Sequence, residues 1–224
     1  MNNDSVATAY TTVDGQYVHE LEIKRSRFIT YLRRVESEGQ ARALVAELRK
    51  KHFDARHHCS AFILGADRTA MRSNDDGEPS GTAGIPMLDA LAKRETASGS
   101  ADLSDIAAVV VRYFGGILLG AGGLVRAYSE SVSSTLEAAP LLRRERLRIL
   151  GVEADYAAAG RLENDLRSAG VQVLGTDYGD SAATLRVALN DDATILTGFN
   201  DRLATLTAGA SHAEDLGTEW VDVR

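Results

Sequence analysis

The stretch Arg112-Tyr-Phe-Gly-Gly-Ile-Leu-Leu-Gly-Ala-Gly-Gly-Leu-Val-Arg-Ala-Tyr128 joins two segments with different hydrophobic patterns. The six residues before it, 106–111, are all apolar and four of them are β-branched, which predicts a buried strand. From Leu124 onward, apolar residues recur at steps of three and four, which predicts an amphipathic helix. The chain is therefore organised around a strand, a glycine-rich loop and a helix.

The loop between these two elements is unusually rich in glycine. Its glycines are Gly115, Gly116, Gly120, Gly122 and Gly123. Glycine lets the backbone approach a ligand closely, and the first N–H groups of a helix attract anions. Because Arg112 and Arg126 add a positive charge at each end, we predict that the loop contacts a negatively charged ligand. The alternative is that the glycines only let strand and helix pack closely, and that Ile117, Leu118 and Leu119 are buried.

The composition is that of a globular protein in a reducing compartment. Of the 224 residues, 44% are hydrophobic and 25% are charged. No apolar run approaches the roughly 20 residues that span a bilayer, and residues 1–20 lack an apolar signal segment. The single cysteine excludes an internal disulfide. We therefore expect a cytoplasmic protein with no membrane partner.

Charge is distributed unevenly along the chain. The net charge of −7 argues against indiscriminate binding of nucleic acid. Residues 141–224 carry nine arginines and fourteen acidic residues, whereas residues 24–34 contain no acid. The basic residues of that short run are Lys24, Arg25, Arg27, Arg33 and Arg34. We expect any polyanion to contact the first half of the chain. The structural alternative is a solvated strand edge, whose positive charge discourages edge pairing.

The remaining patterns predict an α+β protein with two domains, 1–140 and 141–224, that meet near Pro140. Residues 1–16 have the composition of a loose polar arm. In the first domain we predict strands at 17–23, 28–35 and 59–64, helices at 38–52 and from 85, and loops at 74–84 and 96–103. In the second, the order strand, helix, two strands, helix, strand is typical of a ferredoxin-like domain. These elements are predicted at 147–152, 157–169, 171–178, 183–189, 191–207 and 220–223.

A second glycine-containing stretch, Asp75-Asp-Gly-Glu-Pro-Ser-Gly-Thr-Ala-Gly84, comes directly before a predicted helix. Ser80 or Thr82 is placed to cap that helix, and the N–H groups around Gly81 could also receive an anion. We expect this stretch and residues 112–126 to meet in one cleft.

The carboxylates of this stretch, Asp75, Asp76 and Glu78, would repel a bare phosphate. Two explanations fit their presence. They could hold a hard cation such as magnesium between the protein and a phosphate. Alternatively, they could orient basic side chains such as Arg112 or Arg72, which is the favoured explanation because structural charge pairs are common.

His57 and Cys59 are two residues apart in a predicted strand, so their side chains share one face. A thiolate nucleophile needs a neighbouring base or positive field, which His57 could supply. Lone cysteines are usually buried small hydrophobes, and this is the favoured explanation. A zinc site is disfavoured because no further cysteine is available as a ligand.

Two long motifs in the right order, residues 75–84 and 109–128, resemble the YigZ/IMPACT family. Residues 24–28 and 57–59 also look like early motifs of that family. The resemblance covers about residues 17–140, and the last third looks like the additional C-terminal domain of bacterial YigZ-type members.

This resemblance implies a fold and a field of activity. The N-terminal domain is expected to have the left-handed βαβ fold shared with a domain of a ribosomal small-subunit protein and of elongation factor G. The C-terminal domain is expected to resemble the ferredoxin-like last domain of elongation factor G. Descriptions of the family point to translation regulation and nucleic-acid binding.

The leading hypothesis is therefore a cytoplasmic, non-catalytic factor that associates with RNA or the ribosome. Arg112, Arg126 and the loop 115–123 would face phosphate, and the basic run 24–34 would extend that surface. One alternative is a metal-dependent enzyme that handles phosphates or nucleotides through the three carboxylates. Another is a protein-interaction module in which the glycine loop is purely architectural.

Overall fold

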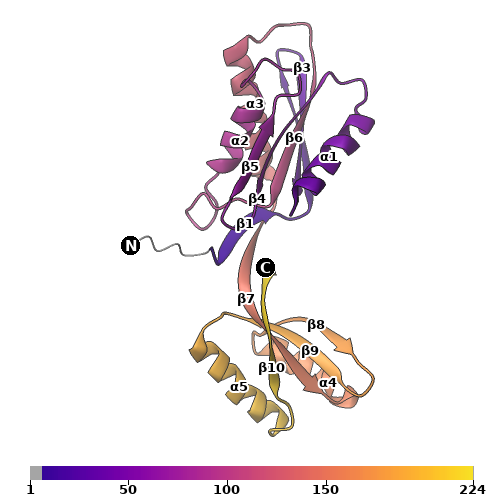
Figure 1. Cartoon of the computed structure of the whole chain (residues 1–224), viewed down its shortest axis with the longest axis vertical. Helices are drawn as coiled ribbons and strands as arrows, with labels where there is room; N and C mark the ends of the chain where they lie inside the picture. Colours follow the sequence, from indigo (N-terminus) through magenta and orange to yellow (C-terminus); the bar gives the residue numbers. More distant parts are fainter. Residues whose placement is uncertain (1–6, 224) are drawn as a thin grey trace. The chain divides into compact units, whose positions relative to one another are not determined.

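The computed structural model describes residues 7–223 and divides into two compact units, with the boundary between Arg143 and Arg144 (Figure 1). Each unit combines a β-sheet with helices, so the predicted α+β class is confirmed. No helix among the described residues is long and apolar enough to cross a membrane.

The first unit is built on an antiparallel five-stranded sheet. Its strand order is β2-β3-β6-β4-β5. The strands are β2 (Gln16–Ile23), β3 (Ser26–Arg34), β4 (His57–Leu64), β5 (Ala70–Asn74) and β6 (Ile106–Tyr113). The central strand β6 is the apolar segment that precedes the glycine loop, and it pairs with both β3 and β4. β5 is absent from the sequence-based prediction, because its residues are exposed or only half-buried.

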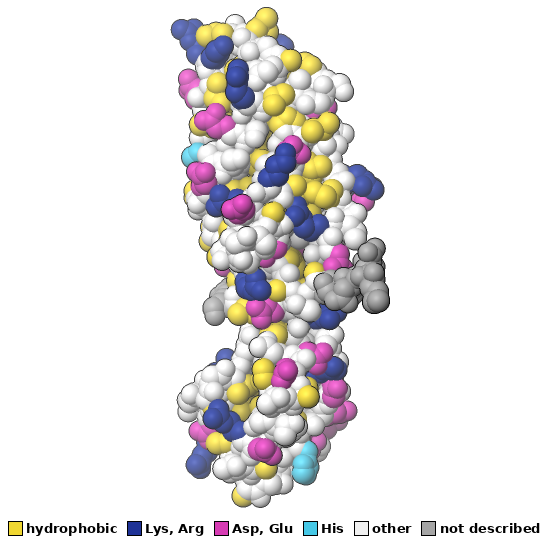
Figure 2. All heavy atoms as spheres, turned by 90° about the vertical axis from the view of Figure 1, so that its left-hand side faces the viewer, with side chains coloured by type: hydrophobic (Ala, Val, Ile, Leu, Met, Phe, Trp, Pro, Cys, Tyr) yellow, Lys and Arg dark blue, Asp and Glu magenta, His cyan; other side chains and the backbone are white. Residues whose placement is uncertain are grey.

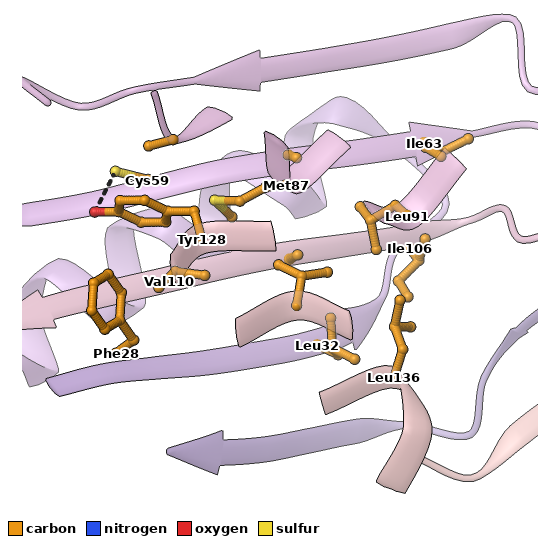
Figure 3. Close-up of a cluster of buried hydrophobic side chains, with 14 of the residues drawn as sticks. Phe28, Leu32, Cys59, Ile63, Met87, Leu91, Ile106, Val110, Tyr128 and Leu136 are labelled. Carbon is orange, nitrogen blue, oxygen red and sulfur yellow. Dashed lines mark hydrogen bonds between the residues drawn. The ribbon is translucent and has the colours of Figure 1, made fainter. Parts of the chain in front are cut away.

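Helices cover both faces of this sheet, which explains why β6 is apolar on both sides. Ala107, Val109 and Val111 pack with α1 (Glu38–Lys51). The alternate residues, from Ile106 to Val110, pack with α2 (Gly84–Ala92) and α3 (Ala121–Ala138). Figure 3 shows this second core, in which Val110, Met87 and Tyr128 come from different elements and point toward one another.

The prediction of a loose arm over residues 1–16 is wrong for its second half. Residues 9–13 form strand β1 (Ala9–Val13), and Tyr10, Thr12 and Val13 are buried. The N–H of Thr11 donates to the carbonyl of Asp102 at 3.1 Å. Residues 1–6 lie outside the described part of the chain.

The second unit has the predicted order βαββαβ. Its elements are β7 (Leu141–Ala154), α4 (Tyr156–Ser168), β8 (Gln172–Tyr178), β9 (Ala183–Leu189), α5 (Ala193–Thr207) and β10 (Ala213–Val223). β9 pairs with β7 and β8 in antiparallel fashion, and β10 pairs with β7. Both helices bury their apolar residues against this sheet. The Asp192 carboxylate caps α5 by accepting the N–H of Thr194 at 2.8 Å.

Candidate anion-binding site

The tip of the β2–β3 hairpin consists of only two residues, Lys24 and Arg25. The strands pair up to Ile23 and Ser26, which lie opposite each other. Both tip residues have positive φ, 48° for Lys24 and 64° for Arg25. Two-residue hairpins normally place Asn or Gly at such positions, because a side chain there is strained by about 1 kcal/mol or more per residue. The chain therefore holds two exposed cations in an unfavourable backbone conformation.

The glycine loop lies directly against this hairpin tip. A Cβ atom placed on Gly115 would lie 2.0 Å from the backbone carbonyl carbon and oxygen of Arg25. The N–H of Gly115 donates to the Ser26 hydroxyl at 3.2 Å. Glycine is therefore required at position 115, because only glycine lets these two backbones approach so closely.

Most of the rest of the loop is open to solvent. Gly116 and Gly120 have positive φ, and a Cβ atom on either residue would meet nothing within 4 Å. Leu118 is 83% exposed, and Ile117 is also exposed. The expectation that these side chains are buried is therefore wrong, although Leu119 does pack on the core. Of the loop's glycines, Gly115 has an architectural role, whereas Gly116, Gly120 and Gly122 leave backbone accessible.

Helix α3 begins at the same end of the unit as the hairpin tip. The ring of Tyr128 packs edge-on against Phe28, with 5.2 Å between ring centroids, and the Ser131 hydroxyl lies 2.5 Å from that of Thr30. The helix thus runs along β3 from the tip inward, and its first residues follow Gly120. Figure 1 shows the start of α3, the loop and the hairpin at the upper end of the first unit.

The start of α3 is free to attract negative charge. Its N-cap is Gly120, and no side chain accepts a hydrogen bond from the first turn. Arg126 is exposed in the second turn, and no carboxylate in the described chain lies within ion-pair distance of it. Figure 2 shows Lys and Arg side chains among hydrophobic ones at this end of the unit.

Arg112 does not face solvent, so its predicted contact with phosphate is wrong. It is 6% exposed, and its Nη1 lies 2.6 Å from Glu78 Oε1 in a buried ion pair. Its guanidinium carbon also lies over two rings, 5.5 Å from the centroid of Phe28 and 5.8 Å from that of Phe114. Arg112 therefore supports the site from inside, and its charge is neutralised by a carboxylate.

Glu78 and Tyr128 link this ion pair to the core. The Tyr128 hydroxyl donates to Glu78 Oε1 at 2.8 Å and lies 3.3 Å from the Cys59 sulfur (Figure 3). The Cys59 thiol is also 3.0 Å from the Asp75 carbonyl. Burial raises the pKa of Cys59 to about 12 and also raises that of Tyr128. Cys59 is 0% exposed, so it fits the favoured explanation of a small buried hydrophobe and not that of a nucleophile paired with His57.

The stretch 75–84 receives no external anion at the start of α2, because Asp75 occupies that position. Its carboxylate accepts the N–H groups of Gly81, Ala83 and Gly84 at 2.8, 3.1 and 2.7 Å. Although burial opposes it, these donors lower the pKa of Asp75. The predicted capping role of Ser80 or Thr82 is therefore wrong, and the Thr82 hydroxyl donates instead to the carbonyl of Pro79 at 2.6 Å.

The three carboxylates of this stretch point to different partners. Asp76 accepts the N–H of His58 at 2.6 Å and pairs with Arg49, while Glu78 pairs with Arg112 and Asp75 caps α2. Within residues 7–223, no group of three His, Cys, Asp or Glu side chains is arranged to hold a metal ion. The two predicted loops do meet, but through the buried Glu78 and not across an open cleft.

The basic run 24–34 separates into paired and unpaired cations. Arg27 pairs with Glu20 at 2.6 Å, and Arg33 and Arg34 also pair with carboxylates. Lys24 and Arg25 have no such partner in the described chain. We define the hairpin–loop surface as Lys24, Arg25, residues 114–120 and the first two turns of α3, including Arg126.

Comparisons with known proteins assign this chain to a family. The Impact N-terminal domain matches residues 24–136, and a domain of unknown function (DUF1949) matches residues 152–210. IMPACT family member YvyE of Bacillus subtilis is 40% identical over 207 residues, which cover 92% of this chain and 91% of that protein. The chain belongs to the IMPACT family. The range matched by its N-terminal domain contains the whole hairpin tip and glycine loop.

Other relatives of this IMPACT-family protein match it over different shares of their length. IMPACT family member YigZ of Escherichia coli is 40% identical over 191 residues, covering 84% of this chain and 89% of that protein. A crystal structure described as a hypothetical protein is 37% identical, with a TM-score of 0.58, and covers 92% of this chain and 96% of that one. The Protein IMPACT homolog of Dictyostelium discoideum is 34% identical over 134 residues, only 33% of its own length.

Proposed function

We propose that this IMPACT-family protein is a cytoplasmic, non-catalytic factor that binds RNA, on its own or on the ribosome, and regulates translation. The hairpin–loop surface is the RNA-binding surface. The observation that carries this proposal is the hairpin tip, where Lys24 and Arg25 are held at positive φ against the loop backbone. Strain of this kind persists where the surrounding structure fixes it, and it is concentrated at functional sites.

Electrostatics supports the same surface. Three exposed cations have no carboxylate partner in the described chain: Lys24 and Arg25 at the hairpin tip that touches the loop, and Arg126 in the helix that follows it. The loop backbone between them is accessible. The uncapped start of α3 adds N–H groups and the positive end of a helix dipole. Phosphate contacts of this type would give sequence-independent binding that weakens with salt. The carboxylates available for catalysis, in contrast, are bonded within the protein: Glu78 to Arg112 and Tyr128, and Asp75 to backbone.

The test is the affinity for a structured RNA at low salt, measured by fluorescence anisotropy. The test variant is Lys24→Asn, Arg25→Gly, Arg126→Ala. Asn and Gly are the preferred residues of this turn, so the hairpin is retained while three charges are removed. We expect affinity to fall at least about tenfold, because each lost phosphate contact contributes to binding. Relief of backbone strain should at the same time raise the midpoint of thermal unfolding.

A matched control removes the same charge elsewhere. Arg42→Ala, Lys50→Ala, Arg72→Ala deletes three exposed cations from α1 and β5. This control should bind RNA within about twofold of the wild type, because it leaves the hairpin–loop surface intact. If the wild type does not bind at low salt, or if both triple variants lose the same affinity, the assignment of this surface is wrong.

A further inference from the structure

Phe114 stands out on the hairpin–loop surface because a large aromatic ring is exposed there. It is 45% exposed and directly precedes the close-packed Gly115. Exposed Ile117 and Leu118 follow in the same loop. A cluster of apolar side chains that remains uncovered beside cations indicates a surface that is covered when a partner binds.

The ring of Phe114 is supported from behind. The Arg112 guanidinium carbon lies 5.8 Å from the centroid of this ring, within the range of a cation–π contact. Arg112 is itself fixed by the ion pair with Glu78 at 2.6 Å and by its contact with the ring of Phe28. An aromatic side chain on so rigid a base loses little conformational freedom when a second flat group stacks on it.

The hairpin cations Lys24 and Arg25 lie next to Phe114 along the chain pairing. β3 and β6 are paired up to Arg27 and Tyr113, so the next residues along, Ser26 and Phe114, are neighbours. The backbone of Arg25 touches Gly115, one residue after Phe114. The surface thus combines an exposed ring with two positive charges at the neighbouring turn.

We propose that Phe114 is a stacking platform for an unpaired base, and that the ligand of the hairpin–loop surface is single-stranded RNA. This inference rests on the proposed function and specifies its substrate class. Aromatic rings beside a positively charged groove bind single strands, because an unpaired base exposes its flat face while the backbone phosphates meet the cations. A duplex covers the faces of its bases, so it can use the cations but not the ring.

The experiment compares a fluorescein-labelled 12-nucleotide oligouridine with a 12-base-pair RNA duplex at the same low salt. We expect the wild type to bind the single strand at least about tenfold more tightly than the duplex, as one stacked base contributes a factor of this size. Phe114→Leu should remove this preference and weaken only single-strand binding, whereas Phe114→Trp should retain it. Leucine keeps an apolar side chain over Arg112, so the fold is preserved, and the unfolding midpoint checks this.

Phe53→Leu is the matched control, because Phe53 is 84% exposed and follows α1. It should leave both affinities unchanged. If single strand and duplex bind equally and Phe114→Leu has no effect, the inference is overturned although RNA binding stays in place. The exposed apolar side chains of the loop would then be assigned to contact with a protein partner. Loss of binding in Phe53→Leu as well would also overturn it. Failure to bind either RNA would overturn the proposed function itself.

Discussion

The role of Arg112 could not be predicted from its neighbours in sequence. It comes directly before a glycine loop, and such a place predicts an anion contact. The partner that decides its role is Glu78, thirty-four residues earlier, and the sequence does not show that the two side chains meet. Among the carboxylates, the explanation that they orient basic side chains describes Glu78 in the structure. Lys24, Arg25 and Arg126 are exposed, as their predicted contact with an anion requires.

The buried ion pair between Glu78 and Arg112 is expected to stabilise the fold. Glu78→Gln removes the negative charge and leaves the Arg112 guanidinium buried without a counter-ion. We expect the free energy of unfolding to fall by about 3–5 kcal/mol, the usual cost of breaking a buried pair. Urea denaturation followed by circular dichroism measures this change.

The double variant Glu78→Gln, Arg112→Met provides the control for this prediction. Replacing both charges with uncharged groups removes the uncompensated charge, so much of the lost stability should return. If Glu78→Gln alone is as stable as the wild type, the pair is not the support of the site that its geometry indicates.

The raised pKa of Cys59 is expected to slow the reaction of its thiol. Because its pKa is raised from 9.0 to about 12, the folded thiol should react with a disulfide reagent at pH 8 at least about a hundredfold more slowly than the unfolded chain. The unfolded thiol ionises at lower pH than the folded one, so its contribution to stability is lost as pH rises above about 9. Rapid labelling of the native protein at pH 8 would contradict this.

At the scale of elements, two glycines of one loop have opposite roles. A Cβ atom on Gly115 would overlap the backbone of Arg25, whereas one on Gly122 would meet nothing within 4 Å. We expect Gly115→Ala to lower the free energy of unfolding by about 3 kcal/mol through forced movement of the hairpin. Gly122→Ala lies in the first turn of α3 and should raise it by roughly 0.5 kcal/mol. Denaturant titration of both variants distinguishes them, and equal effects would contradict the close contact between loop and hairpin.

Most elements can be predicted because their patterns are local. The strand over 106–111 and the helix after the glycine loop both appear, since their apolar periodicity is set by their own residues. β5 cannot be predicted in this way, because its largely polar residues pair with β4 at the edge of the sheet. The capping of α2 also escapes local reasoning, since Asp75 reaches across the turn from six residues before Gly81.

At the scale of the whole molecule, the second unit is easier to predict than the first. Its six elements follow in the order of a known fold, so a correct series of elements gives its topology. In the first unit, β6 enters the sheet between β3 and β4 although it follows both of them in sequence. No local pattern specifies such an insertion, and the strand order cannot be derived from sequence.

The two units differ in charge, and the first unit is therefore the better candidate for binding RNA. Residues 141–224 carry a net charge of −5, from nine arginines and fourteen acidic residues, which disfavours a polyanion there. The cations of the hairpin–loop surface lie in the first unit. RNA binding by this protein is accordingly expected to depend on a small local surface, with few phosphates neutralised.

The dependence of RNA affinity on salt tests this expectation most directly. The logarithm of the association constant should fall linearly with the logarithm of the salt concentration, and the slope counts neutralised phosphates. For the variant Lys24→Asn, Arg25→Gly, Arg126→Ala, the account predicts a slope smaller in magnitude by about 2–3 than that of the wild type. A slope unchanged from the wild type, with the protein folded, would show that these cations meet no phosphate and would contradict the account.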